Sequence, residues 1–208
     1  MVLPELYLYF ADLNPSIIYK RKYILASKSE RRINLLQKIG LDFRVIPSDI
    51  EELEGEDMRP LDVIRFNSLA KSRNVAFGAN GEIVIGADTV VVLDGKIIYK
   101  PENYIHAKKI LLSLSGRKHH VYTGFNLIDT KSGDEIFNYE KTSVHFRDLT
   151  EREINYYLKY HKPFDKAGAY GIQDDFGCFF IEKINGDFYN VVGLPLQKVY
   201  MNLMKLTS

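Results

Sequence analysis

The run Ile83–Leu93 constrains the fold more than any other part of this sequence, because apolar and β-branched residues surround a single charge, Asp88. Such a run is typical of a strand that is buried on both faces, in a sheet covered by helices on both sides. Burying a carboxylate without a partner is costly. We therefore expect Asp88 to be paired or to bind a metal ion. A structural role, in which it only accepts backbone N–H groups, is the less favoured alternative because charges are rare in buried strands.

The rest of the chain shows helix and strand signals in alternation. Strands are predicted at 23–26, 43–47, Ile83–Leu93, 96–99, 119–129, 135–146, 177–184 and 187–192. Helices are predicted at 30–39, 60–77, 103–114, 151–160 and 194–206. Strand–helix alternation comes first and antiparallel pairs follow, which predicts a mixed sheet with flanking helices, in the α/β or mixed α+β class.

Local turn and cap signals support these boundaries. Asp94-Gly95 is a hairpin signal directly after the apolar run. Thr150 and Glu153 have the spacing of a capping box. No repeat or linker divides the chain, so one domain is expected over residues 22–208, after an N-terminal extension at 1–21.

Charge and cysteine content exclude several function classes. The chain has 28 basic and 27 acidic residues, a net charge of +1, which argues against a protein whose main task is to coat nucleic acid. The single Cys178 excludes an internal disulfide and a multi-cysteine zinc site, and its apolar neighbours favour a buried, inert thiol. Residues 1–10 lack the basic start and cleavage site of a signal peptide, and no apolar run is long enough to span a membrane. The sequence therefore predicts a cytoplasmic protein.

Ser27, Arg31 and Arg32 lie where the first predicted strand leads into a helix. Unpaired N–H groups and the helix dipole favour an anion at such a position, and arginines bind phosphate oxygens in pairs of hydrogen bonds. A serine cap with the arginines in solvent explains the same residues equally well.

A second set of candidates follows along the chain. Glu52, within an acidic stretch, could hold a hard divalent cation together with Asp88, although alone it is a solvated charge. Because most lysines in proteins are exposed, Lys71 and Lys100 are each expected at the surface. The segment 165–173 combines glycines with Lys, Tyr and Gln, so its backbone can approach a ligand closely and Gln173 could read a base edge. A loop corner is the alternative.

The adjacent pair His119-His120 is a weaker candidate for metal binding. Neighbouring residues of a strand point to opposite faces of the sheet. We therefore expect no shared metal site there.

Eight segments in this order resemble the Maf family of nucleoside triphosphate pyrophosphatases. They are residues 25–32, 48–52, 70–71, 86–90, 100–101, 114–124, 166–173 and 186–195, and together they extend over about residues 23–206. The resemblance implies a twisted mixed sheet in two lobes around a cleft, related to inosine triphosphatases. It also implies hydrolysis of a nucleoside triphosphate between the α and β phosphates, with a divalent metal cation such as Mg²⁺ or Mn²⁺.

The resemblance also implies residue roles. Asp88 matches the proton-acceptor position, and Glu52 would share the metal with it. The matching phosphate-binding positions are Ser27, Arg31, Arg32, Lys71 and Lys100, with Lys166 as a further residue of the cleft. Arg31, Thr89 and Gln173 match positions that separate substrate subgroups, and they look like the dTTP/UTP branch. The expected partner is a nucleoside triphosphate, without a membrane or a stable nucleic-acid partner, and a homodimer is left open.

The chain departs from the family pattern at a few positions. Glu30 replaces the usual Pro, Tyr99 replaces the usual Gly before Lys100, and residues 174–176 replace a glycine-rich stretch. These changes predict a different placement of Lys100 and a different loop on the base side. Two alternatives remain: a septum-related regulatory binding protein with little catalysis, or a pyrophosphatase that prefers 7-methyl-GTP. A retained catalytic carboxylate favours an enzyme, since binding alone needs no base.

Overall fold

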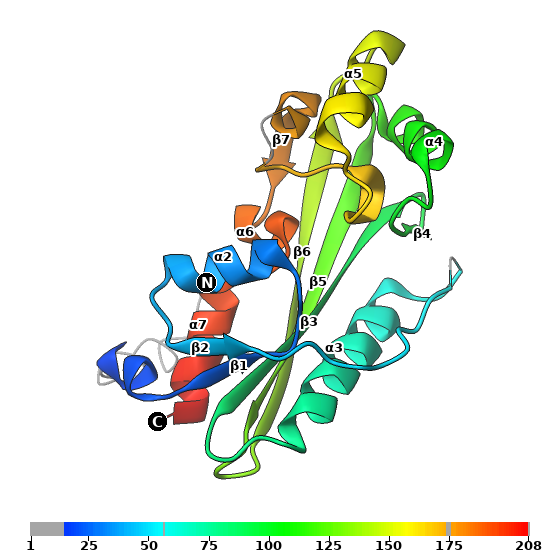
Figure 1. The fold of residues 1–208 in the computed structure, drawn as a ribbon. Coiled ribbons are helices and arrows are strands. Elements are labelled where there is room, and N and C mark those ends of the chain that lie inside the picture. Colours follow the sequence, from blue (N-terminus) through cyan, green and yellow to red (C-terminus); the bar gives the residue numbers. More distant parts are fainter. Residues whose placement is uncertain (1–14, 56, 174–175, 208) are drawn as a thin grey trace.

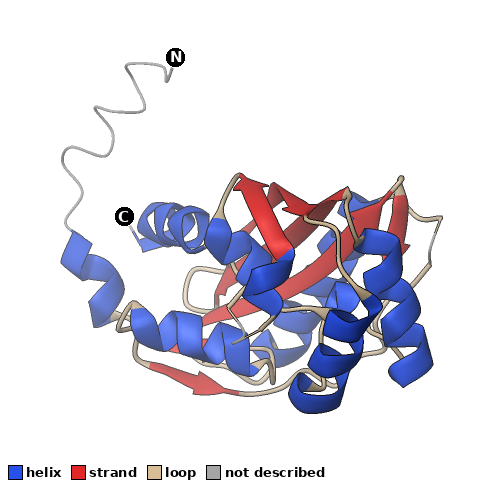
Figure 2. Ribbon diagram, turned by 90° about the horizontal axis from the view of Figure 1, so that it is seen from above, coloured by secondary structure: helices blue, strands red, loops and turns tan. Residues whose placement is uncertain are grey.

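The computed structural model describes residues 15–55, 57–173 and 176–207, which form one seven-stranded mixed sheet with helices on both sides (Figures 1 and 2). The strands are β1 (Tyr23–Leu25), β2 (Phe43–Val45), β3 (Ile83–Leu93), β4 (Lys96–Ile98), β5 (Lys118–Asp129), β6 (Glu135–Phe146) and β7 (Ile181–Asn185). The α-helices are α2 (Glu30–Lys38), α3 (Pro60–Ala76), α4 (Tyr104–Leu114), α5 (Glu151–His161), α6 (Phe188–Val192) and α7 (Leu196–Thr207). Short 3₁₀ helices are η1 (Pro15–Lys20), η2 (Ala167–Ala169) and η3 (Gly177–Phe180).

The strand order is β2-β1-β3-β5-β6-β7, and β4 pairs with β3 outside this path. The pairs β2–β1 and β1–β3 are parallel, whereas all the others are antiparallel. The predicted mixed sheet is therefore confirmed.

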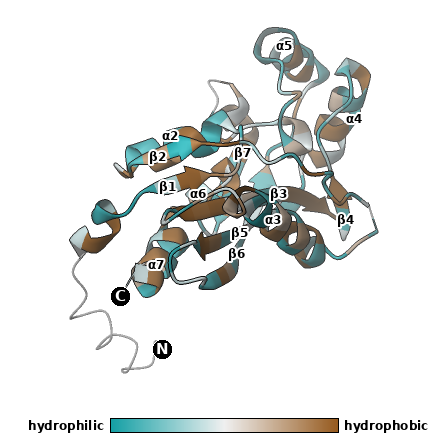
Figure 3. Ribbon diagram, turned by 60° about the horizontal axis from the view of Figure 1, so that its bottom comes forward, coloured by the Kyte–Doolittle hydropathy of each residue, from teal (hydrophilic) through white to brown (hydrophobic). Residues whose placement is uncertain are grey.

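The three long strands β3, β5 and β6 form the centre of the sheet and extend along the length of the molecule (Figure 1). On one face of the sheet, α2 and α7 cover one apolar cluster, while α4 and α5 cover another. On the opposite face, α3 packs on β3 and β4. Figure 3 shows hydrophobic residues concentrated along the sheet and hydrophilic stretches on α2, α4 and α5. Ala87 belongs to the cluster under α2 and α7, and Val91 belongs to the cluster under α4 and α5. Asp88 and Thr89 therefore lie where β3 passes from one cluster to the other.

Helix α3 packs closely on β3 and β5 because each strand has a glycine facing the helix, Gly86 on β3 and Gly124 on β5. A Cβ at Gly86 would lie 2.4 Å from the carbonyl oxygen of Ser68 and 2.7 Å from the nitrogen of Ser72. A Cβ at Gly124 would lie 3.0 Å from the carbonyl oxygen of Ile64. Glycine therefore brings the helix onto the sheet beside Asp88.

Several local predictions are confirmed. The bounds of β3 and β6 agree with the predicted strands. Asp94 and Gly95 have φ angles of 51° and 82°, as a type I′ hairpin turn requires. The capping box at Thr150 and Glu153 is formed in both directions.

Two predictions near the C-terminus are wrong. Residues 187–192 form no strand: Asp187 accepts a hydrogen bond from the nitrogen of Tyr189 as an N-cap, and α6 ends at Gly193, whose φ is 131°. Residues 177–180 form η3 before the strand, and this turn leaves Cys178 exposed rather than buried.

Residues 15–20, at the end of the predicted extension, pack against the domain. Ile18 is buried in the cluster with α7, and the Tyr23 hydroxyl donates a hydrogen bond of 2.7 Å to its carbonyl oxygen. The prediction that residues 1–10 are no signal peptide falls outside the described residues, as do Asp174 and Asp175. Within the described part of the chain, no helix has the length and apolar character that crossing a membrane requires.

Candidate active site

Two carboxylates share one lysine at the contact between α3 and β3. The Lys71 ammonium lies 2.8 Å from Oδ1 of Asp88 and 2.9 Å from Oε1 of Glu52. Asp88 and Lys71 are 7% and 6% exposed, so both charges are largely removed from water. A buried charge of this kind needs a partner. The structure therefore brings together three residues that are 36 positions apart in sequence, from Glu52 to Asp88.

Positive charge around Glu52 keeps it ionised. Partial burial acts to raise its pKa, but the charge and hydrogen bond of Lys71, together with the more distant Lys100 and Arg32, hold the pKa below its ordinary value. Lys100 is exposed, yet its charge reaches this carboxylate. The different placement of Lys100 that Tyr99 leads us to expect stays a prediction.

Arg32 fixes the opposite side of the site. Its Nε donates to the carbonyl oxygen of Gly193 at 2.9 Å, Nη1 to the Ser27 hydroxyl at 3.2 Å, and Nη2 to the Thr89 hydroxyl at 3.0 Å. Burial lowers the pKa of Arg32 to about 10, although the charge of Asp88 opposes the shift. The guanidinium is therefore still protonated at neutral pH and lies next to the catalytic candidates.

Arg31 is directed away from Arg32, towards the segment 165–173. Its Nη1 lies 2.7 Å from Oδ2 of Asp165, and Lys166 lies 2.9 Å from Oδ1 of the same carboxylate. Burial acts to raise the pKa of Asp165, but Lys166 and Arg31 lower it overall. Arg31 and Lys166, both expected in the cleft, thus pair with Asp165, for which the sequence predicts no role.

The predicted specificity residues lie in different surroundings. The Thr89 hydroxyl is 2.9 Å from that of Thr123, which donates to the carbonyl oxygen of Asn190 at 3.0 Å. Gln173 is exposed and directly precedes residues outside the described part. Its contact with a base therefore stays a prediction.

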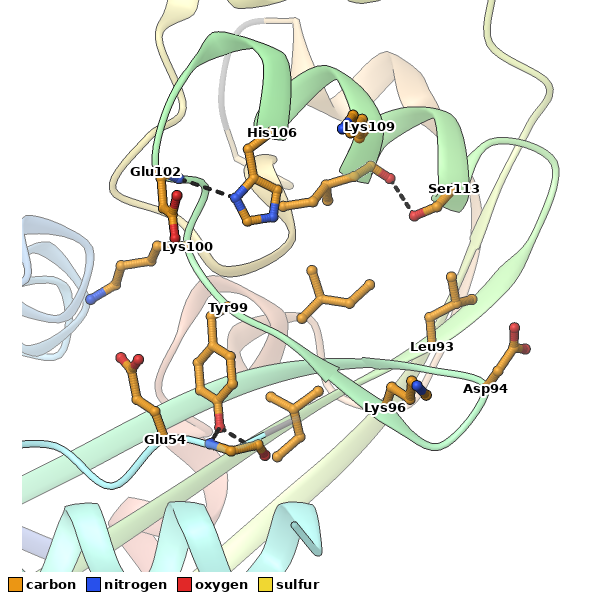
Figure 4. Close-up of a pocket in the computed structure, with 14 residues that line it drawn as sticks. Glu54, Leu93, Asp94, Lys96, Tyr99, Lys100, Glu102, His106, Lys109 and Ser113 are labelled. Atoms are coloured by element: carbon orange, nitrogen blue, oxygen red, sulfur yellow. Dashed lines mark hydrogen bonds between the residues drawn. The ribbon is translucent and has the colours of Figure 1, made fainter. Parts of the chain in front are cut away.

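A pocket of about 990 Å³ lies between the β3–β4 hairpin and α4, and of the site residues it is lined by Lys100 but by neither Glu52 nor Asp88. Leu93, Ile97, Ile98 and Ile110 supply apolar lining. Figure 4 shows Lys100 and Glu54 at one end of this pocket, with the Tyr99 hydroxyl directed at the backbone of Gly55. Residues 46–55, which carry Glu52, are called the acidic segment below. Tyr99, which the family pattern lacks, contacts this segment at Gly55.

His119 and His120 point to different surroundings, as expected. His119 is fully buried with its Nε2 2.8 Å from the Tyr170 hydroxyl, whereas His120 Nδ1 is 3.0 Å from the Ser143 hydroxyl. The two side chains contact different residues, as neighbouring positions of a strand should, and the absence of a joint metal site stays a prediction.

Sequence reasoning missed Asn67, which contacts the site directly. Its side-chain nitrogen donates to Oδ2 of Asp88 at 3.2 Å, and the residue is 2% exposed. The available signal was its position four residues before Lys71 and one turn after the apolar Val63 and Ile64 on the same face of α3. A polar residue on the buried face of a helix needs a partner, and here the partner is the site itself.

The fold and the site define an α/β protein in which a buried aspartate–lysine pair and a more exposed glutamate lie beside a protonated arginine. The chain belongs to the Maf family, since the family model described as "Maf-like protein" matches residues 22–206. A dTTP/UTP pyrophosphatase of Dictyoglomus thermophilum is 44% identical over 90% of this chain and 97% of its own length. Proteins of the same name from Syntrophus aciditrophicus and Bacillus mycoides are 43% and 42% identical, each over 90% of this chain and over 91% and 97% of their own lengths.

Among solved structures, the Staphylococcus aureus Ham1 protein is similar with a TM-score of 0.46. The two sequences are 17% identical, and the match covers 62% of this chain and 73% of the Ham1 chain.

Proposed function

We propose that this chain hydrolyses nucleoside triphosphates, with dTTP and UTP preferred, between the α and β phosphates to give the monophosphate and pyrophosphate. The observation that carries the proposal is the buried ion pair of Asp88 and Lys71, which the more exposed Glu52 joins, beside Arg32. The name dTTP/UTP pyrophosphatase, carried by relatives that match nine tenths of the chain, supports the choice of nucleotide.

In the proposed reaction, a water molecule attacks the α-phosphorus and pyrophosphate leaves. Asp88 is the carboxylate that accepts the proton of this water. Lys71 and Arg32 place positive charge beside it, where charge develops on the phosphate oxygens. Lys100 and Arg31 add further positive charge at the exposed side. Such electrostatic stabilisation is usually the largest contribution to catalysis of this kind.

Glu52 and Asp88 are the residues that would hold a divalent cation. Both already approach a single positive charge, the Lys71 ammonium, to less than 3 Å. Across residues 15–55, 57–173 and 176–207, no group of three or more His, Cys, Asp or Glu is arranged for a metal. One or two carboxylates supplemented by substrate phosphates is the arrangement that Mg²⁺ commonly uses. When bound, the cation neutralises phosphate charge and polarises a phosphoryl oxygen.

Product analysis tests the proposal. The purified protein is incubated with dTTP, UTP, CTP, GTP and 7-methyl-GTP in the presence of Mg²⁺ or Mn²⁺. We expect monophosphate and pyrophosphate, without orthophosphate until an inorganic pyrophosphatase is added. We also expect a chelator to abolish the activity and either cation to restore it. Direct release of orthophosphate would make the protein a phosphatase and refute the proposal.

A further inference from the structure

Glu52 lies in a segment that has no regular structure of its own. Residues 46–55 belong to neither a helix nor a strand. Side chains from other elements bind its backbone instead. The nitrogen of Asp49 donates to Oδ1 of Asn74 at 3.1 Å, and the nitrogen of Leu53 donates to Oδ1 of Asn67 at 2.7 Å. The position of Glu52 therefore depends on these side chains.

Asn67 binds Leu53 in the way that a neighbouring strand would. Its Oδ1 accepts from the nitrogen of Leu53, and its Nδ2 donates to the carbonyl oxygen of Leu53 at 3.1 Å. The same Nδ2 donates to Asp88. Asn67, Lys71 and Asn74 are spaced i, i+4 and i+7, so they lie on one face of α3. One face of this helix thus contacts both the acidic segment and β3.

Tyr99 holds the other end of the segment. Its hydroxyl accepts a hydrogen bond from the nitrogen of Gly55 at 2.7 Å and lies 3.2 Å from the carbonyl oxygen of the same residue, to which it donates. Its ring packs against the apolar cluster of α3, β3 and β4. Its own carbonyl oxygen accepts from the nitrogen of Gly168 at 3.4 Å. Tyr99 therefore connects the acidic segment to the segment 165–173.

We infer that Asn67 and Tyr99 are positioning residues, which hold residues 53 and 55 and thereby set Glu52 against Lys71 and Asp88. The inference rests on the proposed function, because the arrangement of Glu52 matters only if the site is catalytic. Neither side chain needs to touch the nucleotide for this role.

The physical reason is that two carboxylates near one another repel. Glu52 is on an exposed, irregular segment, with a side chain that is 38% exposed, and it could turn into solvent at little cost. Hydrogen bonds on both sides of it, to Leu53 and to Gly55, restrict the backbone that carries it. Misplacement of a catalytic group by about 1 Å can cost about 100-fold in rate, so modest loosening is measurable.

The clearest test is Tyr99→Phe, which keeps the ring and removes both hydrogen bonds to Gly55. We expect kcat for dTTP to fall about tenfold while KM changes less than about twofold, since a positioning contact acts on the reaction rather than on uniform binding. Tyr104→Phe is the matched control, because the hydroxyl of Tyr104 on α4 bonds Asn155 on α5 and not the acidic segment. The control should keep the wild-type kcat.

A double-mutant cycle separates positioning from general structural damage. If Tyr99 acts through Glu52, Tyr99→Phe should cost less than about twofold in a Glu52→Gln background, whereas independent effects would multiply. Asn67→Leu should lose more kcat, and only part of that loss should disappear in the Glu52→Gln background, because Asn67 contacts Asp88 as well as Leu53. Equal losses in both backgrounds would overturn the inference.

Hydrogen exchange provides a readout that needs no activity. In Tyr99→Phe, the amide of Gly55 should exchange faster than in the wild type, with α5 unchanged. Unaltered exchange at Gly55 would overturn the inference, and so would an unaltered kcat in Tyr99→Phe when the wild type is active. A wild type that fails to cleave any nucleoside triphosphate would instead refute the proposed function, and the two failures are therefore distinguishable.

Discussion

Asp88 is the side chain that accepts the proton of water in the proposed reaction. Asp88→Asn keeps the shape of the side chain but removes the proton acceptor, so we expect kcat to fall by at least about 100-fold, within the range usual for a lost general base. The fold should survive, because the amide oxygen can still accept from Lys71 and Glu52 still pairs with that ammonium. Steady-state kinetics and circular dichroism measure the two effects. A folded variant with near wild-type turnover would show that Asp88 is structural.

Gln173 is where the choice of base is expected to be made. A Gln amide has both a donor and an acceptor, which complement the O4 and N3–H edge of thymine or uracil. A Glu can accept but not donate, so Gln173→Glu should weaken the preference for pyrimidines more than it weakens hydrolysis overall. Unpaired buried groups cost about 1–3 kcal/mol each, which sets the size of the effect.

Values of kcat/KM for dTTP, UTP, CTP, GTP and 7-methyl-GTP on both proteins measure this preference. Unchanged ratios in the variant, or a wild type that favours 7-methyl-GTP, would show that Gln173 does not read the base.

At the scale of elements, the packing of α3 on β3 links stability to activity. A Cβ at Gly86 would collide with the backbone at Ser68 and Ser72, so Gly86→Ala should push the helix away from the strand. Overpacking of this kind costs about 1–3 kcal/mol. Because α3 also carries Lys71, the variant should lose activity as well as free energy of unfolding.

Gly78→Ala is the matched control for this prediction. Gly78 lies just after α3, and the nearest atom to an added Cβ there is 4.0 Å away. Denaturant unfolding should place this control close to the wild type. Equal stability of Gly86→Ala and Gly78→Ala would contradict the close-contact argument.

Element boundaries could largely be predicted from the sequence, because they are local. The apolar run, the hairpin signal at Asp94-Gly95 and the capping box each act within a few residues. The failure at 187–192 was also local: Asp187 as a cap and Gly193 as a stop identify a five-residue helix, but its apolar residues imitate a strand. The exposure of Cys178 could not be predicted, since the 3₁₀ turn that exposes it departs from the apolar pattern.

Contacts within the site were harder to predict because they join distant parts of the chain. Arg32 bonds the carbonyl oxygen of Gly193, 161 positions away, and a backbone carbonyl has no sequence signature. Base rates alone place Lys71 and Lys100 at the surface, which is wrong for the buried Lys71 and right for the exposed Lys100; only the resemblance to the Maf family indicated that both belong to the site. The pairing of Lys71 with both carboxylates, and the part played by Asn67, needed the structure.

At the scale of the whole molecule, His119 makes stability depend on pH. Burial, with a smaller effect from His120, lowers the pKa of His119 from 6.5 to about 3. Between these values the unfolded chain binds a proton that the folded protein does not. Stability therefore falls as the pH falls below about 6.5, with a slope of up to about 1.4 kcal/mol per pH unit until the folded pKa is reached.

His119→Gln should flatten this dependence between pH 6.5 and pH 5, because Gln does not titrate. Denaturant unfolding at several pH values measures the slope. His120→Gln is the comparison, since the pKa of His120 is also lowered but its side chain is only half-buried. A slope that survives in His119→Gln would assign the pH dependence to other groups.

The lysine shared by Asp88 and Glu52 gives the resting enzyme an internal counter-ion. Two carboxylates near one another repel, and the Lys71 ammonium between them offsets this repulsion while no nucleotide is present. In the proposed reaction, an incoming triphosphate brings oxygens that compete for the same ammonium. Lys71 can then exchange a carboxylate partner for a phosphate. The same ammonium thus holds the two carboxylates in place between turnovers and binds the substrate during each turnover.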